Sequence, residues 1–184
     1  YRRRRQMCIR DRYDQKPILY PDSDIPIVKP ESIGDADCLG EKELRTLEIV
    51  RAAIQNGERA LIYTSWVRTD SQQKLKKLLT DEGYRTEILT DKIKTTERED
   101  WVQKKLAAGM QVLIVNPSLV ETGLDLNAFT TLVFYSMGYK LFTLRQASRR
   151  SWRINQKAPA VKVYMLYYED TMQQKCLSLI HISE

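Results

Sequence analysis

Two arginines near the end of the chain have the spacing of a charge-stabilising pair. Arg150 and Arg153 are three residues apart in Leu141–Ile154, a predicted helix, so both side chains project from one helical face. Two fixed guanidinium groups can stabilise the charge that develops on a γ-phosphoryl group during its transfer. On composition alone, the commoner interpretation of Arg149, Arg150 and Arg153 is a solvated basic face. Both interpretations stay open at this point.

A second polar segment directly follows a short apolar run at Gln111–Asn116. It reads PSLVETGLDL and contains the hydroxyl of Thr122, the flexible backbone of Gly123 and the carboxylate of Asp125. In parallel sheets, ligands bind outside the carboxyl ends of the strands. If the apolar run is a strand of such a sheet, this segment lies where a site is expected.

Strands and helices are predicted to alternate from Glu41 to Tyr167. The predicted strands are Ala60–Thr64, Arg85–Leu89, Gln111–Asn116, Thr131–Ser136 and Val161–Tyr167. The predicted helices are Glu41–Asn56, Asp70 or Ser71 to Gly83, Thr95 or Thr96 to Gly109, and Leu141–Ile154. Short apolar strands rich in β-branched residues are typical of parallel sheets that are covered on both faces. The pattern therefore predicts an α/β fold with three layers, a parallel sheet between two layers of helices.

The boundaries of the predicted helices have start and stop signals. Gly57, Gly83 and Gly109 each follow a helical pattern, and glycine readily takes the left-handed conformation that ends a helix. Thr96 and Glu99 have the spacing of a capping box, in which two side chains bond backbone N–H groups at a helix start. These signals predict three helix ends and one helix start.

The sequence has no conventional phosphate-binding loop. The GxxxxGK[ST] and GxGxxG motifs are absent, and no Asp-Glu pair follows a strand. We therefore expect that this chain cannot bind a nucleoside triphosphate in the P-loop manner by itself. The missing glycine-rich loop also disfavours a Rossmann-like transferase. Three Cys and one His, without CxxC or HxxxH spacing, predict no metal site.

The positive charge is concentrated at the start of the chain. The 184 residues have a net charge of +6, but residues 1–12 alone contain six Arg and one Asp. Residues 13–176 carry a net charge of only +2, which predicts weak binding of nucleic acid by this part alone. No apolar run approaches the roughly 18 residues of a membrane-spanning helix. We expect no membrane partner and a cytoplasmic location.

Both ends differ in pattern from the region between them. Residues 1–12 (YRRRRQMCIRDR) and 177–184 (LSLIHISE) resemble translated sequencing-adapter read-through and are expected to be artefacts. A basic arm that binds phosphates is the alternative for the first segment. Residues 13–40 contain four widely spaced prolines that exclude a continuous helix, and we expect an extended linker from an upstream part of the polypeptide. Residues 41–176 are expected to form the domain.

Four segments resemble, in order and spacing, the C-terminal RecA-like lobe of superfamily 2 helicases, particularly Swi/Snf-type DNA translocases. Gly123-Leu124-Asp125-Leu126 resembles the Gly-Leu-Asn-Leu of motif V. The motif VI pattern Gln-Ala-x-Gly-Arg-x-x-Arg-x-Gly-Gln is matched by Gln146, Ala147, Arg150, Arg153 and Gln156. Ala60–Trp66 resembles motif IV, and Arg98–Trp101 resembles the Arg-x-x-x-Phe element that precedes motif V.

This sequence also departs from the family pattern. Arg149 and Asn155 replace the two glycines of motif VI, and Val120-Glu121 replaces a Gly-Gly pair before motif V. The resemblance therefore points to a divergent bacterial or mobile-element branch. The fold that it implies is the RecA-like, P-loop NTPase-type form of the predicted parallel sheet.

The resemblance implies an ATP-binding role for five residues. Arg150 and Arg153 would reach the γ-phosphate, and Gln146 would orient that helix or touch the phosphates and the attacking water. Gly123 and Asp125 would line the nucleotide cleft. ATP and Mg²⁺ would be bound mainly by a missing N-terminal RecA-like lobe of the same polypeptide.

The resemblance also implies a nucleic-acid partner, DNA that is expected to be double-stranded. Ser65 and Thr122 would hydrogen-bond phosphates of the tracked strand, contacts that position the protein without reading sequence. The expected function is that of one lobe of an ATP-dependent DNA helicase or translocase, inactive without the N-terminal lobe. The alternative is a non-catalytic α/β binding or scaffold domain whose basic helix docks a protein or nucleic acid.

Overall fold

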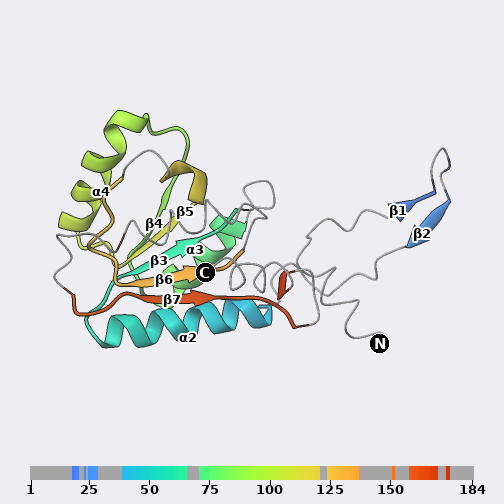
Figure 1. Ribbon diagram of the computed structural model, residues 1–184, viewed down its shortest axis with the longest axis horizontal. Coiled ribbons are helices and arrows are strands. Elements are labelled where there is room, and N and C mark those ends of the chain that lie inside the picture. The colour runs from blue at the N-terminus through green and yellow to red at the C-terminus, as the bar shows by residue number, and fades with distance from the viewer. Residues whose placement is uncertain are drawn as a thin grey trace, which may run out of the picture.

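A five-stranded parallel sheet forms the centre of the computed structural model of the chain (Figure 1). The structure describes residues 18–20, 23, 25–28, 39–65, 71–120, 124–136, 151, 158–169 and 173–174. The strands of the sheet are β3 (Ala60–Tyr63), β4 (Thr86–Leu89), β5 (Val112–Val115), β6 (Thr131–Phe134) and β7 (Lys162–Met165). Their order is β4-β5-β3-β6-β7, and each neighbouring pair is parallel. Each strand lies within its predicted range, so the predicted parallel α/β sheet is confirmed.

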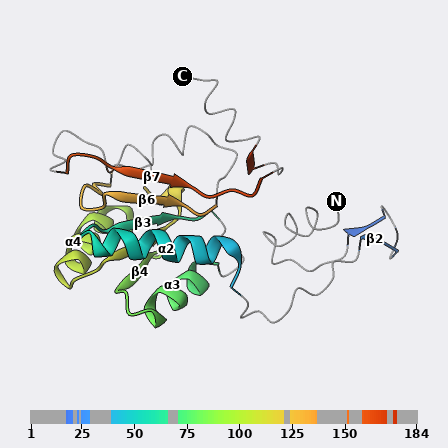
Figure 2. The ribbon, with the colours of Figure 1, turned by 90° about the horizontal axis from the view of Figure 1, so that it is seen from below.

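Helices cover both faces of this sheet. α2 (Glu41–Gln55) and α3 (Ser71–Asp81) pack on one face, and α4 (Arg98–Ala107) packs on the other (Figure 1, Figure 2). Adjacent side chains of a strand point to opposite faces, so in β3 Ile62 packs with α2 and α3 whereas Leu61 packs with α4. The three predicted layers are confirmed. None of the helices in the described part of the chain is long and apolar enough to span a membrane.

The three inner strands are buried along their whole length. Every residue of β3, β5 and β6 is buried, which explains why their sequences are apolar runs without alternation. Burying one Leu or Ile side chain contributes about 1.5–3 kcal/mol relative to leaving it exposed. This apolar layer is the rigid support for the loops that leave the sheet at its carboxyl edge, the edge at which the strands end.

Three helices end at a glycine in the left-handed region. The angle φ is +73° at Gly57, +88° at Gly83 and +87° at Gly109, each separated by one residue from the end of α2, α3 or α4. After each glycine, the next N–H bonds a carbonyl five residues back, as Tyr84 does with Leu79 at 2.9 Å. This is the hydrogen-bond pattern of the Schellman motif, which favours glycine because a Cβ is strained there. The three predicted helix ends are confirmed.

The predicted capping box at Thr96 and Glu99 is wrong. A 3-10 turn, η1 (Thr95–Glu97), comes first, and α4 then begins with Glu97 in the cap position and no side-chain cap hydrogen bond. The N–H of Glu97 bonds the carbonyl of Lys94 at 2.9 Å within this turn. Because the turn delays the helix by one residue, Glu99 is the second helical residue and not the third, as a capping box requires.

The segment before the domain contains two short strands. β1 (Ile18–Leu19) and β2 (Pro26–Val28) pair antiparallel and form a separate two-stranded sheet. They lie within residues 13–40, for which an extended linker is predicted. The predicted helix at Leu141–Ile154 lies outside the described residues, except for Ser151.

Candidate functional site

The carboxyl ends of three neighbouring strands meet at one edge of the sheet. Tyr63 of β3 lies in register with Val115 of β5 and with Phe134 of β6. The pairing continues for one residue, because the Thr64 N–H bonds the Val115 carbonyl at 3.1 Å and the Tyr135 N–H bonds the Tyr63 carbonyl at 3.0 Å. The chain leaves β3 toward one side of the sheet and reaches β6 on the other, so this edge is a topological switch point. Open α/β sheets bind ligands at such points.

Three hydroxyl residues, here called the hydroxyl cluster (Thr64, Ser65 and Ser136), join the ends of β3 and β6. Ser136 Oγ accepts a hydrogen bond from the Ser65 N–H at 2.8 Å and lies 3.2 Å from Thr64 Oγ1. Thr64 and Ser136 are buried, whereas Ser65 is half-buried. The backbone of Ser65 is therefore fixed at the carboxyl edge. The sequence identified Ser136 only as the end of a predicted strand, because it does not specify that this strand pairs with the one that precedes Ser65.

The loop after β5 begins with a capped 3-10 turn, η2 (Pro117–Leu119). Asn116 Oδ1 accepts hydrogen bonds from the N–H of Ser118 at 3.0 Å and from its hydroxyl at 2.9 Å. Pro117 restricts the backbone at the first position of the turn, and Val120 is completely buried just after it. The loop therefore leaves the sheet along a defined path.

Asp125 lies further along the same loop. Its Oδ1 accepts a hydrogen bond from the Asn127 N–H at 3.2 Å, and Asp125 is half-buried. Its neighbours Leu124 and Leu126 are buried in the apolar cluster on the α4 face. The carboxylate is thus held in a local turn between two anchored leucines, and its contact with a nucleotide stays a prediction.

Five of the predicted site residues lie outside the described residues: Thr122, Gly123, Gln146, Arg150 and Arg153. Of the predicted set, the structure therefore places Ser65 and Asp125. Ser151, between the two arginines, is described and is completely buried, so the chain packs against protein at this point.

A buried lysine in the first turn of α2 also approaches the carboxyl edge. Lys42 is only 4% exposed, and its Nζ lies 3.4 Å from the carbonyl oxygen of Tyr135 and 2.8 Å from Oε1 of Gln173. The same Nζ lies 4.7 Å from the ring centroid of Tyr168. A buried ammonium group needs such acceptors and ring faces because its removal from water is costly. Lys42 therefore joins the start of α2 to residues that follow β6 and β7.

Glu43 extends these contacts to α3. Its Oε1 accepts a hydrogen bond from the Tyr135 hydroxyl at 2.8 Å and lies 3.9 Å from Nζ of Lys74. Glu43 is buried as well. Hydrophobic periodicity cannot find Lys42 or Glu43, because charged residues in a helical pattern are read as exposed. We call Lys42, Glu43, Lys74, Tyr135, Tyr168 and Gln173 the buried polar network.

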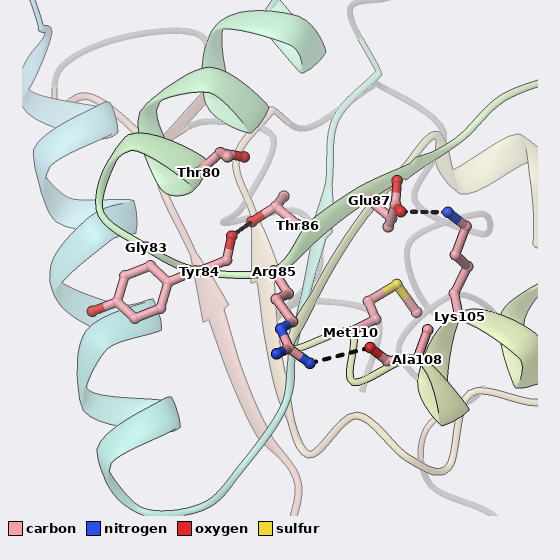
Figure 3. Close-up of a pocket in the computed structure, with 9 residues that line it drawn as sticks. All are labelled: Thr80, Gly83, Tyr84, Arg85, Thr86, Glu87, Lys105, Ala108 and Met110. Atoms are coloured by element: carbon pink, nitrogen blue, oxygen red, sulfur yellow. Dashed lines mark hydrogen bonds and ion pairs between the residues drawn. The ribbon is translucent and has the colours of Figure 1, made fainter.

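In the part of the chain that the structure describes, two cavities open at the opposite, amino-terminal edge of the sheet. The first, of about 370 Å³, is lined by the turn before β4 and the end of α4, and its charged residues are Arg85, Glu87 and Lys105 (Figure 3). The second, of about 420 Å³, lies between the segments that precede β3, β6 and β7. Neither cavity is at the carboxyl edge, so neither is assigned to the candidate site.

The first cavity contains the carboxylate of an ion cluster, that of Glu87. Glu87 of the edge strand β4 forms ion pairs with Lys76 of α3 and Lys105 of α4. Burial acts to raise the pKa of Glu87, but the hydrogen bonds from Lys105 and Lys76 outweigh it and hold this pKa below its ordinary value. A firmly ionised carboxylate suits the joining of two helices. Among the described residues, no group of three or more His, Cys, Asp or Glu is placed to hold a metal ion.

Comparisons with known proteins agree with this arrangement. Residues 42–155 match the family described as "Helicase conserved C-terminal domain", a range that includes the hydroxyl cluster, Asp125 and both arginines. Among solved structures, the C-terminal part of the Fun30 ATPase domain has a TM-score of 0.67 at 17% identity, covering 76% of this chain and 44% of that one. The Pyrococcus furiosus Hef helicase domain has a TM-score of 0.59 at 18% identity, covering 77% of this chain and 28% of that one.

The chain spans less than half the length of either of these structures, and at such identities the likeness shows the fold alone. The search of curated proteins found no match. The fold is the RecA-like fold of these neighbours, so the predicted fold class is confirmed. Since the family match covers more than half of the sequence, the chain belongs to the helicase conserved C-terminal domain family.

Proposed function

We propose that this chain is the C-terminal RecA-like lobe of an ATP-dependent DNA translocase of the Swi/Snf type, in a bacterial or mobile-element branch. The observation that carries the proposal is the extent of the helicase family match over residues 42–155. This range includes both the Gly123–Leu126 loop and the segment with Arg150 and Arg153. The parallel sheet supports the proposal, because its carboxyl edge gathers the polar residues Ser65 and Ser136 at a switch point.

In this proposal the reaction is the transfer of the γ-phosphoryl group of ATP to water. Arg150 and Arg153 donate hydrogen bonds to the γ-phosphoryl oxygens and offset the charge that develops on them. Gln146 orients this helix or the attacking water, and Gly123 and Asp125 line the cleft. An N-terminal RecA-like lobe of the same polypeptide binds most of the ATP and the Mg²⁺, since the sequence of this chain contains no P-loop.

The proposed DNA contacts are made through phosphates, by Ser65 and Thr122. Ser65 suits this role because it is half-buried and its backbone N–H is held by Ser136 Oγ, which fixes its position at the end of β3. Phosphate contacts set the register of a protein on duplex DNA without reading its sequence. The net charge of +2 over residues 13–176 limits the affinity of this lobe alone.

Movement along DNA is proposed to come from the opening and closing of the cleft between the two lobes. Closure on ATP and opening after hydrolysis would move this lobe one step along the DNA backbone. The buried polar network supports such coupling, because Lys42 and Glu43 tie the start of α2 to Tyr135 at the carboxyl edge. The chain enters α2 from residues 13–40, the proposed linker to the other lobe. By itself, this lobe is expected to be inactive.

The complete coding sequence that contains residues 13–176 provides the test. We expect its upstream part to encode a strand–GxxxxGK[ST]–helix and a following Asp-Glu pair. The encoded protein should hydrolyse ATP faster in the presence of duplex DNA, and Arg150→Ala should lower kcat by about 10³-fold or more, as expected for an arginine finger. Arg149→Ala is the matched control, because it removes the same charge at a position where the family has glycine, and it should retain activity.

Two results would contradict the proposal. The first is a stop codon or an unrelated domain upstream of residue 13. The second is a DNA-stimulated ATPase activity that is equal in Arg150→Ala and in the wild type. Either result would favour a non-catalytic α/β binding or scaffold domain with a basic surface helix.

A further inference from the structure

Arg98 is a buried cation at the first residue of α4. Its Nη1 donates a hydrogen bond to the Leu119 carbonyl at 2.9 Å, and its Nε donates one to the Ile93 carbonyl at 3.2 Å. The residue is 8% exposed. Ile93 lies in the loop after β4, and Leu119 ends η2 in the loop after β5. One guanidinium group therefore bonds the loops that follow two adjacent strands.

The arginine side chain at position 98 does more than fill space between α4 and the two loops. Removing a guanidinium from water is costly, and a hydrophobic side chain would pack against Ile93 and Leu119 at lower cost. In the described part of the chain, the hydrogen-bond partners of Arg98 are the two backbone carbonyls, and no salt bridge holds it. A hydrophobic side chain cannot bond these carbonyls. The planar guanidinium, with donors pointing in different directions, can hold both at once.

The carbonyl held by Arg98 belongs to the root of the candidate site loop. Asn116 fixes the start of η2 by bonding Ser118, and Arg98 fixes its end at Leu119. Val120 follows directly and is completely buried. The next residues of the chain, 121–125, include Thr122, Gly123 and Asp125, the three residues of this loop to which the proposed function gives DNA and nucleotide contacts.

We propose that Arg98 is a positioning residue for the loop after β5. It fixes the end of η2 against α4 and so sets the position from which the loop continues through Val120 toward Asp125. Arg98 itself touches neither nucleotide nor DNA and acts through the Leu119 carbonyl. What the loop binds rests on the proposed function, whereas the positioning of the loop does not.

Hydrogen exchange on the 184-residue chain tests the positioning directly. In Arg98→Gln, the hydrogen-bonded amide of Val120 should exchange at least about ten-fold faster, as expected when a bond from a charged donor is lost. The amides of Asn127 and Phe129, which are bonded further along the loop, report whether the effect spreads. The amides of β3 and β6 should keep their rates. In Arg98→Lys, the exchange rate of the Val120 amide should lie between those of the wild type and Arg98→Gln, because one ammonium group cannot span both carbonyls in the same geometry.

The chain offers a matched control. Arg85 also donates from Nη1 to a backbone carbonyl, that of Ala108 at 3.2 Å, but it is exposed and lies at the amino-terminal edge of the sheet. Arg85→Gln should leave the exchange of Val120 unchanged. If Arg98→Gln accelerates the strand amides by the same factor as Val120, Arg98 contributes only to general stability and the proposal is overturned. Unchanged exchange at Val120 overturns it as well.

ATPase kinetics of the complete protein separate this inference from the proposed function. Arg98→Gln should lower kcat/KM at least about ten-fold relative to Arg85→Gln, with partial recovery in Arg98→Lys. If the wild-type protein has no DNA-stimulated ATPase activity, the proposed function fails, and the exchange result alone decides the role of Arg98. If the wild type is active and Arg98→Gln is as active as Arg85→Gln, the positioning role fails while the proposed function stands.

Discussion

Replacement of Ser136 by alanine removes the oxygen on which the hydroxyl cluster depends. Without Oγ, the Ser65 N–H loses its acceptor at 2.8 Å and the Thr64 hydroxyl loses its partner at 3.2 Å. Thr64 is completely buried and Ser136 is 4% exposed, so water cannot readily take the place of the lost oxygen. The variant therefore leaves two polar groups unsatisfied at the carboxyl edge.

The expected loss of stability follows from the burial of these two groups. A buried hydroxyl such as that of Thr64 costs about 1–2 kcal/mol when it is left without a partner, and the half-buried Ser65 N–H costs about 0.5–1 kcal/mol. Ser136→Ala should thus lower the free energy of unfolding by about 1.5–3 kcal/mol. Thr64→Val removes the hydroxyl itself and keeps the bond between Ser65 and Ser136, so it should cost less than about 1 kcal/mol.

Urea denaturation of the 184-residue chain, followed by circular dichroism, measures both values. The midpoints should shift while the dependence of the free energy on urea concentration stays constant. Ser118→Ala is a suitable control, because it removes a hydroxyl that bonds Asn116 in an exposed turn, and it should cost less than about 0.5 kcal/mol. If Ser136→Ala costs no more than Thr64→Val, the hydroxyl cluster does not hold the ends of β3 and β6 together.

Two further predictions concern the amino-terminal edge of the sheet. Hydrogen bonds from Lys162 and Thr131 hold the pKa of Glu58 below its ordinary value of 4.5. The contribution of Glu58 to stability is therefore complete above pH 4.5 and is lost as the pH falls through the pKa of the folded state. Thermal melts of the wild type and Glu58→Gln should converge toward low pH, and a constant difference would contradict this cause. Gly57→Ala and Gly109→Ala should each lower the free energy of unfolding by about 1 kcal/mol or more, because both glycines have a positive φ. The loss should be larger for Gly109→Ala, because of these two sites only Gly109 would press its new Cβ on an arginine guanidinium, that of Arg85. Equal urea midpoints for these two variants would show that this guanidinium moves aside without cost.

Most of the fold could be predicted from the sequence because its signals are local. The runs that form β3, β5 and β6 are apolar on both faces, and Gly57 and Gly83 stop their helices within a few residues of the strands that follow. The start of α4 was less predictable, because two local structures could begin this helix. The sequence favoured a capping box at Thr96 and Glu99, whereas the chain forms a 3-10 turn before Arg98.

The candidate site could be predicted only in part because its contacts join distant residues. Ser65 was named through the resemblance of Ala60–Trp66 to motif IV, but its partner Ser136 lies across a strand pairing that the sequence does not specify. Lys42 was not found, and Arg98 was named only as part of a segment that resembles a family element, for a different reason. Charged residues in helical patterns are normally solvated, and only the folded structure shows that these two are buried against backbone carbonyls.

The central position of β3 also governs how the domain can fold while it is being synthesised. β3 is the first strand of the parallel sheet to be made, yet its two neighbours begin only at Val112 and Thr131. Pairing between such distant segments is slow, because a long loop must close before any contact rewards it. A nascent chain that stops short of Val112 therefore leaves an apolar strand unpaired, and an unpaired apolar strand is prone to aggregate.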